Sequence, residues 1–82
     1  GQTTKQILDA PEEAIYVWVN ERIYYPKKIA NKLGRNDLII KGPSVLEYGR
    51  LRGINKPIIL DHAVSLTSRQ ADGYAEYVKM KR

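Results

Sequence analysis

Three short runs of uninterrupted apolar residues constrain the fold of this chain more than any other feature of its sequence. The runs cover residues 14–19, 38–40 and 57–60, and β-branched and aromatic residues are frequent in them. Apolar residues follow one another without alternation, which is typical of strands that are covered on both faces. We therefore expect three buried strands, with residues 14–19, the longest run, as the central one.

Capping signals predict helices near both ends of the chain. Thr3 followed by Gln6, and Thr67 followed by Gln70, have the spacing of a capping box, in which each side chain hydrogen-bonds to the other residue's backbone amide. The last helix is expected to bury an apolar stripe. The stripe consists of Ala71, Tyr74, Ala75 and Val78.

Two further helices are expected between the strands. Pro26 has the fixed φ that suits a first helical position, and Gly34 suits the C-terminal cap of the same helix. Its expected buried stripe consists of Tyr25, Ile29 and Leu33. Ser44 is expected to cap a short helix between the second and third strands.

Strands that alternate with helices predict a parallel sheet, because parallel neighbours are joined by right-handed helical crossovers. The 82 residues suffice for one compact unit, so we expect a single α/β domain over residues 1–82, with a three-stranded parallel sheet in a three-layer α/β/α arrangement. Ligands bind outside the carboxyl ends of such strands. Asn20, residues 41–44 and residues 61–62 should therefore share one edge of the sheet.

Composition excludes several classes of function. The chain has no cysteine and one histidine, so it offers no disulfide, thiolate ligand, thiol nucleophile or histidine-rich metal site. It also lacks the Gly-x-Ser-x-Gly motif of serine hydrolases. We expect no metal, no cofactor and no catalytic residue. The apolar runs are far shorter than the roughly 20 residues that span a bilayer, and no signal peptide is evident, which favours a cytoplasmic, intracellular protein without membrane contact.

The charge of the chain indicates an anionic partner. A net charge of +5 and a pI near 9.6 would attract DNA, RNA or an acidic protein surface. Basic residues lie among tyrosines around the second helix and on later loops, a combination that suits phosphate and base contacts. The basic residues are Arg22, Lys27, Lys28, Lys32, Arg35, Lys41, Arg50, Arg52 and Lys56. Of these, Lys28, Lys41, Arg50 and Arg52 are the candidate nucleic-acid contacts; solvated lysines and a core position for Tyr25 are the alternative.

Over residues 1–66 the order of motifs resembles the nucleotide-binding core of P-loop ATPases of the helicase and phage terminase kind. Residues 1–4, Gly-Gln-Thr-Thr, are similar to the end of a phosphate loop that opens a helix. Residues 58–61, three apolar residues and an aspartate, are similar to a Walker B strand. The resemblance implies that Thr3, Thr4, Asp61 and His62 are the remnant of a nucleotide site.

Two departures from this family pattern argue against hydrolysis. Gln2 stands where the phosphate loop has its lysine, and His62 stands where the family has the glutamate that orients the attacking water. The resemblance thus implies a non-catalytic, P-loop-like binding or adaptor domain of nucleic-acid metabolism, encoded by a phage, rather than an enzyme. Asp61 is also compatible with a capping or loop-bracing role, and His62 with that of a loop histidine whose ring is satisfied by its neighbours.

Two other functions fit the same residues. The chain could be a protein-interaction module, an inhibitor or accessory factor of a host or phage enzyme, that docks through Tyr74 and Tyr77 of the C-terminal helix. It could also be a nucleotide-binding subunit whose incomplete phosphate loop is completed by upstream residues or by another subunit.

Overall fold

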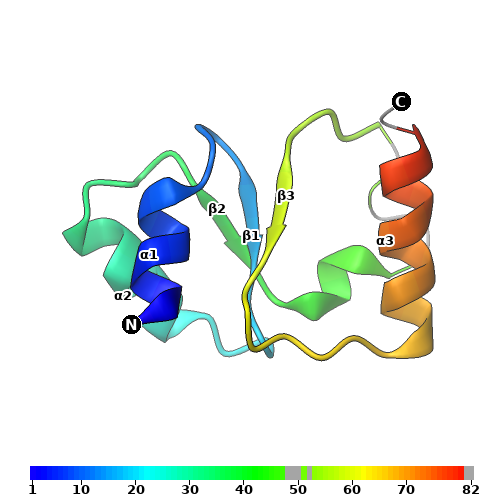
Figure 1. The fold of residues 1–82 in the computed structure, drawn as a ribbon, viewed down its shortest axis with the longest axis horizontal. Helices are drawn as coiled ribbons and strands as arrows, with labels where there is room; N and C mark the ends of the chain where they lie inside the picture. Colours follow the sequence, from blue (N-terminus) through cyan, green and yellow to red (C-terminus); the bar gives the residue numbers. More distant parts are fainter. Residues whose placement is uncertain (48–50, 52, 81–82) are drawn as a thin grey trace.

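The computed structural model describes residues 1–47, 51 and 53–80, which form an α/β fold (Figure 1). Helices and strands alternate along the described chain, as the sequence predicts. The elements in order are α1 (Gln2–Asp9), β1 (Ile15–Val17), α2 (Tyr24–Lys32), β2 (Ile39–Lys41), the 3-10 helix η1 (Pro43–Leu46), β3 (Ile58–Leu60) and α3 (Ser68–Met80).

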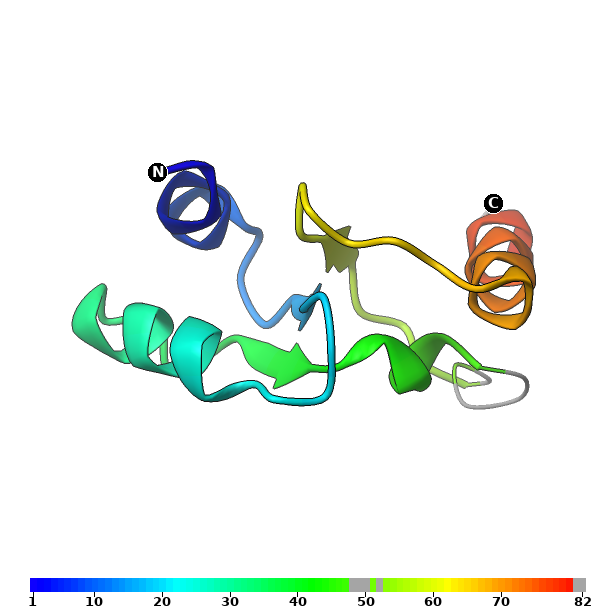
Figure 2. The same cartoon turned by 90° about the horizontal axis from the view of Figure 1, so that it is seen from below.

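The three strands form a parallel sheet in the order β2-β1-β3, so the predicted parallel sheet with the first run at its centre is confirmed. Tyr16 lies opposite Ile40 on one side and Ile59 on the other. Figure 2 shows α1 and α2 on one side of the sheet and η1 and α3 on the other. The expected three-layer arrangement is therefore present.

Alternate residues of β1 enter two separate cores. Tyr16 belongs to the cluster under α1 and α2, together with Ile7 and Ala30. Ile15 and Val17 belong to a second cluster, on the side of η1 and α3. All three residues of β1 are buried, because each face of the central strand is covered by its own layer. This explains why its sequence is apolar without alternation.

The two predicted capping boxes have different outcomes. Thr67 and Gln70 form the expected reciprocal pair: the Thr67 amide donates to Gln70 Oε1 at 3.0 Å and the Gln70 amide to Thr67 Oγ1 at 3.2 Å. The Thr3 box is wrong, since Gly1 is the N-cap of α1 and no side chain caps it. Thr3 and Gln6 lie inside the helix, and their side chains donate to Asp61, just after β3, and to the carbonyl of Leu60, the last residue of β3.

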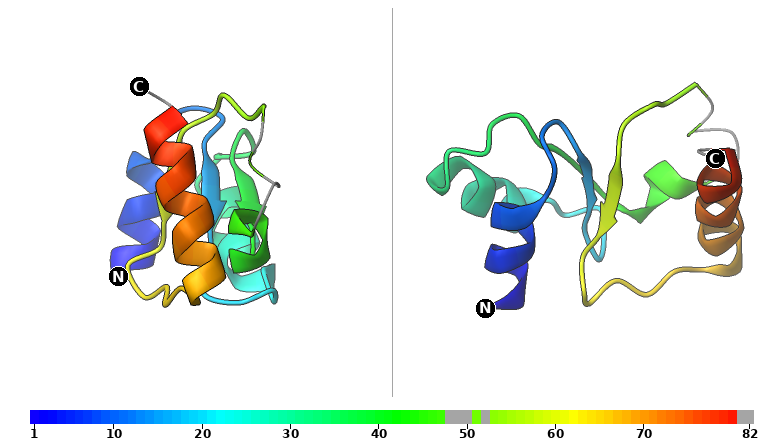
Figure 3. Two further views of the ribbon diagram at one scale, coloured as in Figure 1. Left: turned by 90° about the vertical axis from the view of Figure 1, so that its right-hand side faces the viewer. Right: turned by 45° about the horizontal axis from the view of Figure 1, so that its top comes forward.

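The expected apolar stripe of α3 is wrong for three of its four residues, and Tyr74 alone of the four packs against the second core cluster as predicted. Ala71, Ala75 and Val78 are exposed, and the buried face instead contains Gln70 and Tyr77. Figure 3 shows this helix packed beside η1 at one side of the molecule. Gly73 is the reason for this orientation: a Cβ there would overlap the carbonyl oxygen of Leu46, so the helix approaches η1 along its glycine side.

Replacing Gly73 with alanine tests this close approach. In an exposed helix Gly→Ala stabilises by about 1 kcal/mol, but Gly73→Ala should destabilise by about 1–3 kcal/mol because the methyl group displaces η1. The free energy of unfolding in urea measures the effect. Asn31→Ala, on the exposed face of α2, is the control and should be neutral or mildly stabilising. A Gly73→Ala protein more stable than the parent would contradict the packing described.

Candidate functional site

The carboxyl ends of the three strands meet at one edge of the sheet. Val17 ends β1 between Lys41 of β2 and Leu60 of β3. The ladder continues past these residues, because the Trp18 amide donates to the Lys41 carbonyl and the Asp61 amide to the Val17 carbonyl. The N-terminal end of α1 lies at the same edge (Figure 1). The edge therefore brings together the segments that the sequence predicts there.

Asp61 is the most deeply buried charged residue at this edge, with only 2% of its surface exposed. Its Oδ2 accepts hydrogen bonds from Thr3 Oγ1, at 3.0 Å, and from the Tyr16 hydroxyl. Its Oδ1 accepts one from the Ala63 amide at 2.9 Å. These donors compensate the burial of the carboxylate and join α1, β1 and the loop after β3 at one point.

Asp61 and its three donors, Thr3, Tyr16 and the Ala63 amide, are here named the Asp61 cluster. Within it the Tyr16 hydroxyl acts as a hydrogen-bond donor. Burial disfavours its phenolate, and the hydrogen bond and negative charge of Asp61 act in the same direction, so the pKa of Tyr16 is raised well above its usual range. The hydroxyl thus keeps its proton at any pH at which the domain would be studied. Neither the apolar pattern of β1 nor any motif in the sequence points to this role.

Gln6 ties the loop after β3 to α1. Its Nε2 donates to the Leu60 carbonyl at 3.1 Å, and its Oε1 accepts from the His62 amide at 2.7 Å. The His62 ring lies close to both Gln6 and Asp61: its Nδ1 is 3.2 Å from Gln6 Oε1 and 3.4 Å from Asp61 Oδ1. The capping-box spacing predicts that Gln6 caps α1, whereas its side chain instead bonds to Leu60 and His62.

Three of the four residues predicted as a nucleotide-site remnant lie together. Thr3, Asp61 and His62 are joined directly or through Gln6. Thr4 lies apart from them and lines a cavity between α1 and α2. The Asp61 oxygens accept hydrogen bonds from inside the protein, and the Thr3 hydroxyl donates its proton to one of them. As it stands, the cluster braces the edge of the sheet.

Tyr16→Phe tests the brace. The change removes one donor from a buried carboxylate and keeps the ring, so we expect the free energy of unfolding to fall by about 1–3 kcal/mol. Tyr24→Phe, which removes a hydroxyl from an exposed ring, should leave stability unchanged. Equal stabilities of the two variants in urea titrations would show that the Tyr16 hydroxyl does not support Asp61.

A second polar link joins the loop after β1 to η1. The Glu21 carboxylate accepts from the Ser44 amide at 2.9 Å and from the Ser44 hydroxyl at 2.8 Å. Gly42 leaves room for it, because a Cβ there would overlap that carboxylate. Asn20 forms only a local turn, accepting from the Arg22 amide at 2.8 Å. Ser44 is therefore bound by Glu21 rather than acting as the predicted cap, whereas Gly42 is the N-cap of η1.

The candidate nucleic-acid contacts are distributed over several elements. Lys28 is exposed on α2 and Lys41 is exposed at the end of β2, while Arg50 and Arg52 lie outside the described residues. In the described part of the chain, Lys28 and its neighbours Lys27 and Lys32 make no ion pair with a carboxylate. Their ammonium groups therefore face solvent.

Two tyrosines accompany these lysines at the start of α2. Tyr24 is 84% exposed and Tyr25 is 60% exposed, so the expected core position of Tyr25 is wrong. The Tyr25 ring instead packs against Trp18, with the ring centroids 5.8 Å apart and the planes tilted by 39°. Trp18 is itself only partly buried and packs at the border of the first core cluster.

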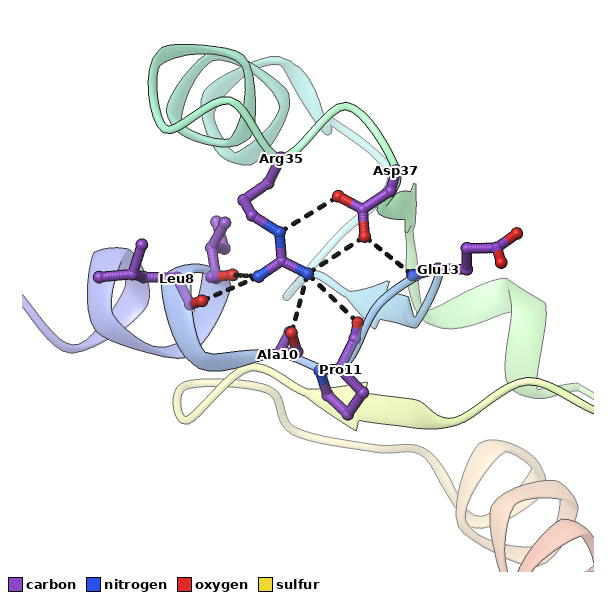
Figure 4. Close-up of polar contacts among 7 residues, drawn as sticks. Leu8, Ala10, Pro11, Glu13, Arg35 and Asp37 are labelled. Atoms are coloured by element: carbon purple, nitrogen blue, oxygen red, sulfur yellow. Dashed lines mark hydrogen bonds and ion pairs between the residues drawn. The ribbon is translucent and has the colours of Figure 1, made fainter.

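Arg35 differs from the lysines because it turns inward (Figure 4). Its guanidinium donates to the carbonyls of Ile7, Leu8, Ala10 and Pro11, at 2.8 to 3.3 Å, and pairs with Asp37 at 3.1 Å. It thus satisfies carbonyls that the C-terminal end of α1 leaves without helical partners. Arg35 has a structural role and is not available to an anionic ligand.

Asp37 holds the guanidinium in place. Its hydrogen bonds from Arg35, and then from the Glu13 amide, lower the pKa of Asp37 to about 2. The carboxylate is ionised over most of the acid range, and the same bonds connect the end of α2 to the turn before β1. Both residues belong to the scaffold that positions α1 against α2.

The lowered pKa predicts an acid limb of stability. An aspartate titrates near 3.9 in the unfolded chain, so the contribution of Asp37 is present above about pH 4 and is lost as the pH falls toward 2. Urea midpoints measured across this range should fall more steeply in the parent than in Asp37→Asn. Arg35→Ala should flatten the profile in the same way because the partner is gone. A profile unchanged by Asp37→Asn would contradict this assignment.

Comparisons of the chain with protein-family models, with curated proteins and with solved structures found no match. Within the described residues, no helix has the length and apolar character needed to cross a membrane, and no group of three or more His, Cys, Asp or Glu is placed to hold a metal ion. The fold, the Asp61 cluster and the exposed face of α2 are therefore the basis for a functional proposal.

Proposed function

We propose that this chain is a non-catalytic, P-loop-like α/β domain that binds nucleic acid as a binding or adaptor module. The observation on which the proposal depends is the exposed face of α2, where Lys28 and Lys32 lie beside Tyr25. The helix contains no acidic residue to oppose them. Ammonium groups that follow phosphates and aromatic rings that stack on bases are the chemistry of single- and double-strand binding surfaces.

The absence of catalysis is supported by the state of Asp61. In P-loop enzymes a threonine hydroxyl and an aspartate both serve the magnesium ion. Here Thr3 and Asp61 hydrogen-bond to each other at 3.0 Å, and the other Asp61 oxygen is held by the Ala63 amide. The pairing of these two residue types supports the P-loop-like part of the proposal, and their direct bond supports a structural use of the remnant. Phage origin enters the proposal through the sequence resemblance alone.

The protein-interaction alternative loses one of its two proposed anchors. Tyr77 is buried, and its hydroxyl donates to the Lys56 carbonyl, so this ring is part of the second core cluster. Tyr74 is partly buried against the same cluster. The pair of exposed tyrosines on which that function depended is therefore absent, and the basic face of α2 is the better-supported surface.

Salt-dependent binding tests the proposed function. Log affinity for a DNA or RNA oligonucleotide, measured by fluorescence anisotropy, should fall linearly with log salt, and alanine at Lys28, Lys41, Arg50 or Arg52 should each reduce the slope by about 0.7 to 0.9. Lys79→Ala, on α3, is the control and should keep the parent slope. A flat salt response, or no binding in dilute buffer, would remove nucleic acid as the partner.

A further inference from the structure

A cavity lies between α1 and α2, and none of the residues that bond to Asp61 lines it. Its volume is about 400 Å³, within the range of small-ligand sites. In Figure 2 α2 lies below α1, and Thr4 is the described residue of α1 that lines the cavity. The described residues that line the cavity are Thr4, Tyr25, Lys28, Ile29, Lys32 and Leu33.

The lining combines an apolar floor with a cationic rim. Ile29 and Leu33 are partly buried against the core and supply the floor, while Lys28 and Lys32 are exposed. The two lysines are four residues apart, so they share one face of the helix and repel each other until an anion lies between them. No acidic side chain is among the lining residues. The complementary ligand has a flat or apolar body and a negative charge.

Tyr25 supplies a platform for the flat part of such a ligand. Its ring is 60% exposed, yet the contact with Trp18 supports it from one side. A ring held in this way loses little conformational freedom when a second ring stacks on it. Bases can stack on a protein side chain when they are unstacked from their neighbours, as in a single strand, whereas a duplex hides their faces.

We propose that this cavity, here named the α1–α2 groove, binds one nucleotide unit of a single-stranded nucleic acid. The base stacks on Tyr25, and the phosphate lies between Lys28 and Lys32. The inference rests on the proposed function and adds to it a preference for single strands over duplexes. It also assigns Lys28 to a defined site rather than to a diffuse basic surface.

The experiment compares one labelled oligonucleotide, free and annealed to its complement, in anisotropy titrations at fixed salt. The parent should bind the single strand about fivefold or more tightly than the duplex, because stacking of one base is worth about 1–3 kcal/mol and 1 kcal/mol corresponds to about fivefold in affinity. Tyr25→Ala should reduce this ratio toward one, and Lys28→Ala should weaken single-strand binding. Tyr25→Phe keeps the ring and should keep the preference, and thermal melts of each variant check that it is folded.

The chain provides matched controls one position away. Tyr24 is even more exposed than Tyr25 but does not line the groove, and Lys27 lines a different cavity, beside Asn36 and Ile40. Tyr24→Ala and Lys27→Ala should therefore keep the single-strand preference. If Tyr24→Ala and Tyr25→Ala reduced the ratio of single-strand to duplex affinity equally, the proposal that the α1–α2 groove binds a nucleotide would be overturned.

Failure of the inference and failure of the proposed function give different results. Salt-dependent binding with equal affinity for single strand and duplex overturns the groove and leaves the nucleic-acid function in place. Binding that polyglutamate displaces as well as an unlabelled oligonucleotide also overturns the groove, since charge alone would then explain it. No salt-dependent binding to either nucleic acid overturns both.

Discussion

The buried carboxylate of Asp61 is the contact on which the arrangement of the other elements depends. Burying a charge is costly unless donors surround it, and here the donors come from α1, from β1 and from the loop that follows β3. Thr3 and Tyr16 bond to the same oxygen, so α1 is fixed against the central strand. Since α1 also forms one wall of the α1–α2 groove, the shape of that groove depends on a carboxylate that does not line it.

The parts of the fold that could be predicted from sequence are those that depend on local pattern. Uninterrupted apolar runs separated by helices lead to a parallel sheet because few other arrangements cover both faces of such strands. The Thr67 box formed because both partners lie three residues apart. Thr3 has the same local pattern, yet Asp61, 58 positions away, is a stronger partner for its hydroxyl than its own helix end.

The errors at the tyrosines have a related cause. A tyrosine at helical spacing fits a buried stripe and an exposed one equally well, because its ring is apolar and its hydroxyl is polar. Tyr25 lies outside the core, where Trp18 covers one side of it, and Tyr77 lies inside, where a backbone carbonyl accepts its hydrogen bond. Gly73 determines which side of α3 faces η1, because only a glycine fits against the Leu46 carbonyl. The sequence alone does not reveal this, since a glycine inside a helix indicates close packing only when the backbone opposite it is known.

Net charge alone does not separate a binding surface from a scaffold, and this chain shows why. Lys28 lies on α2 and Arg35 just after its end, but the planar guanidinium of Arg35 donates to four carbonyls and a carboxylate, a geometry that a lysine ammonium cannot match. The Arg35 guanidinium is therefore fully engaged in the contacts that hold α1 against the end of α2. The lysines of α2 have no such partners among the described residues, so their charge remains directed at solvent. Because no acidic side chain is among the described residues that line the α1–α2 groove, no carboxylate of that lining competes with an anion for Lys28 and Lys32.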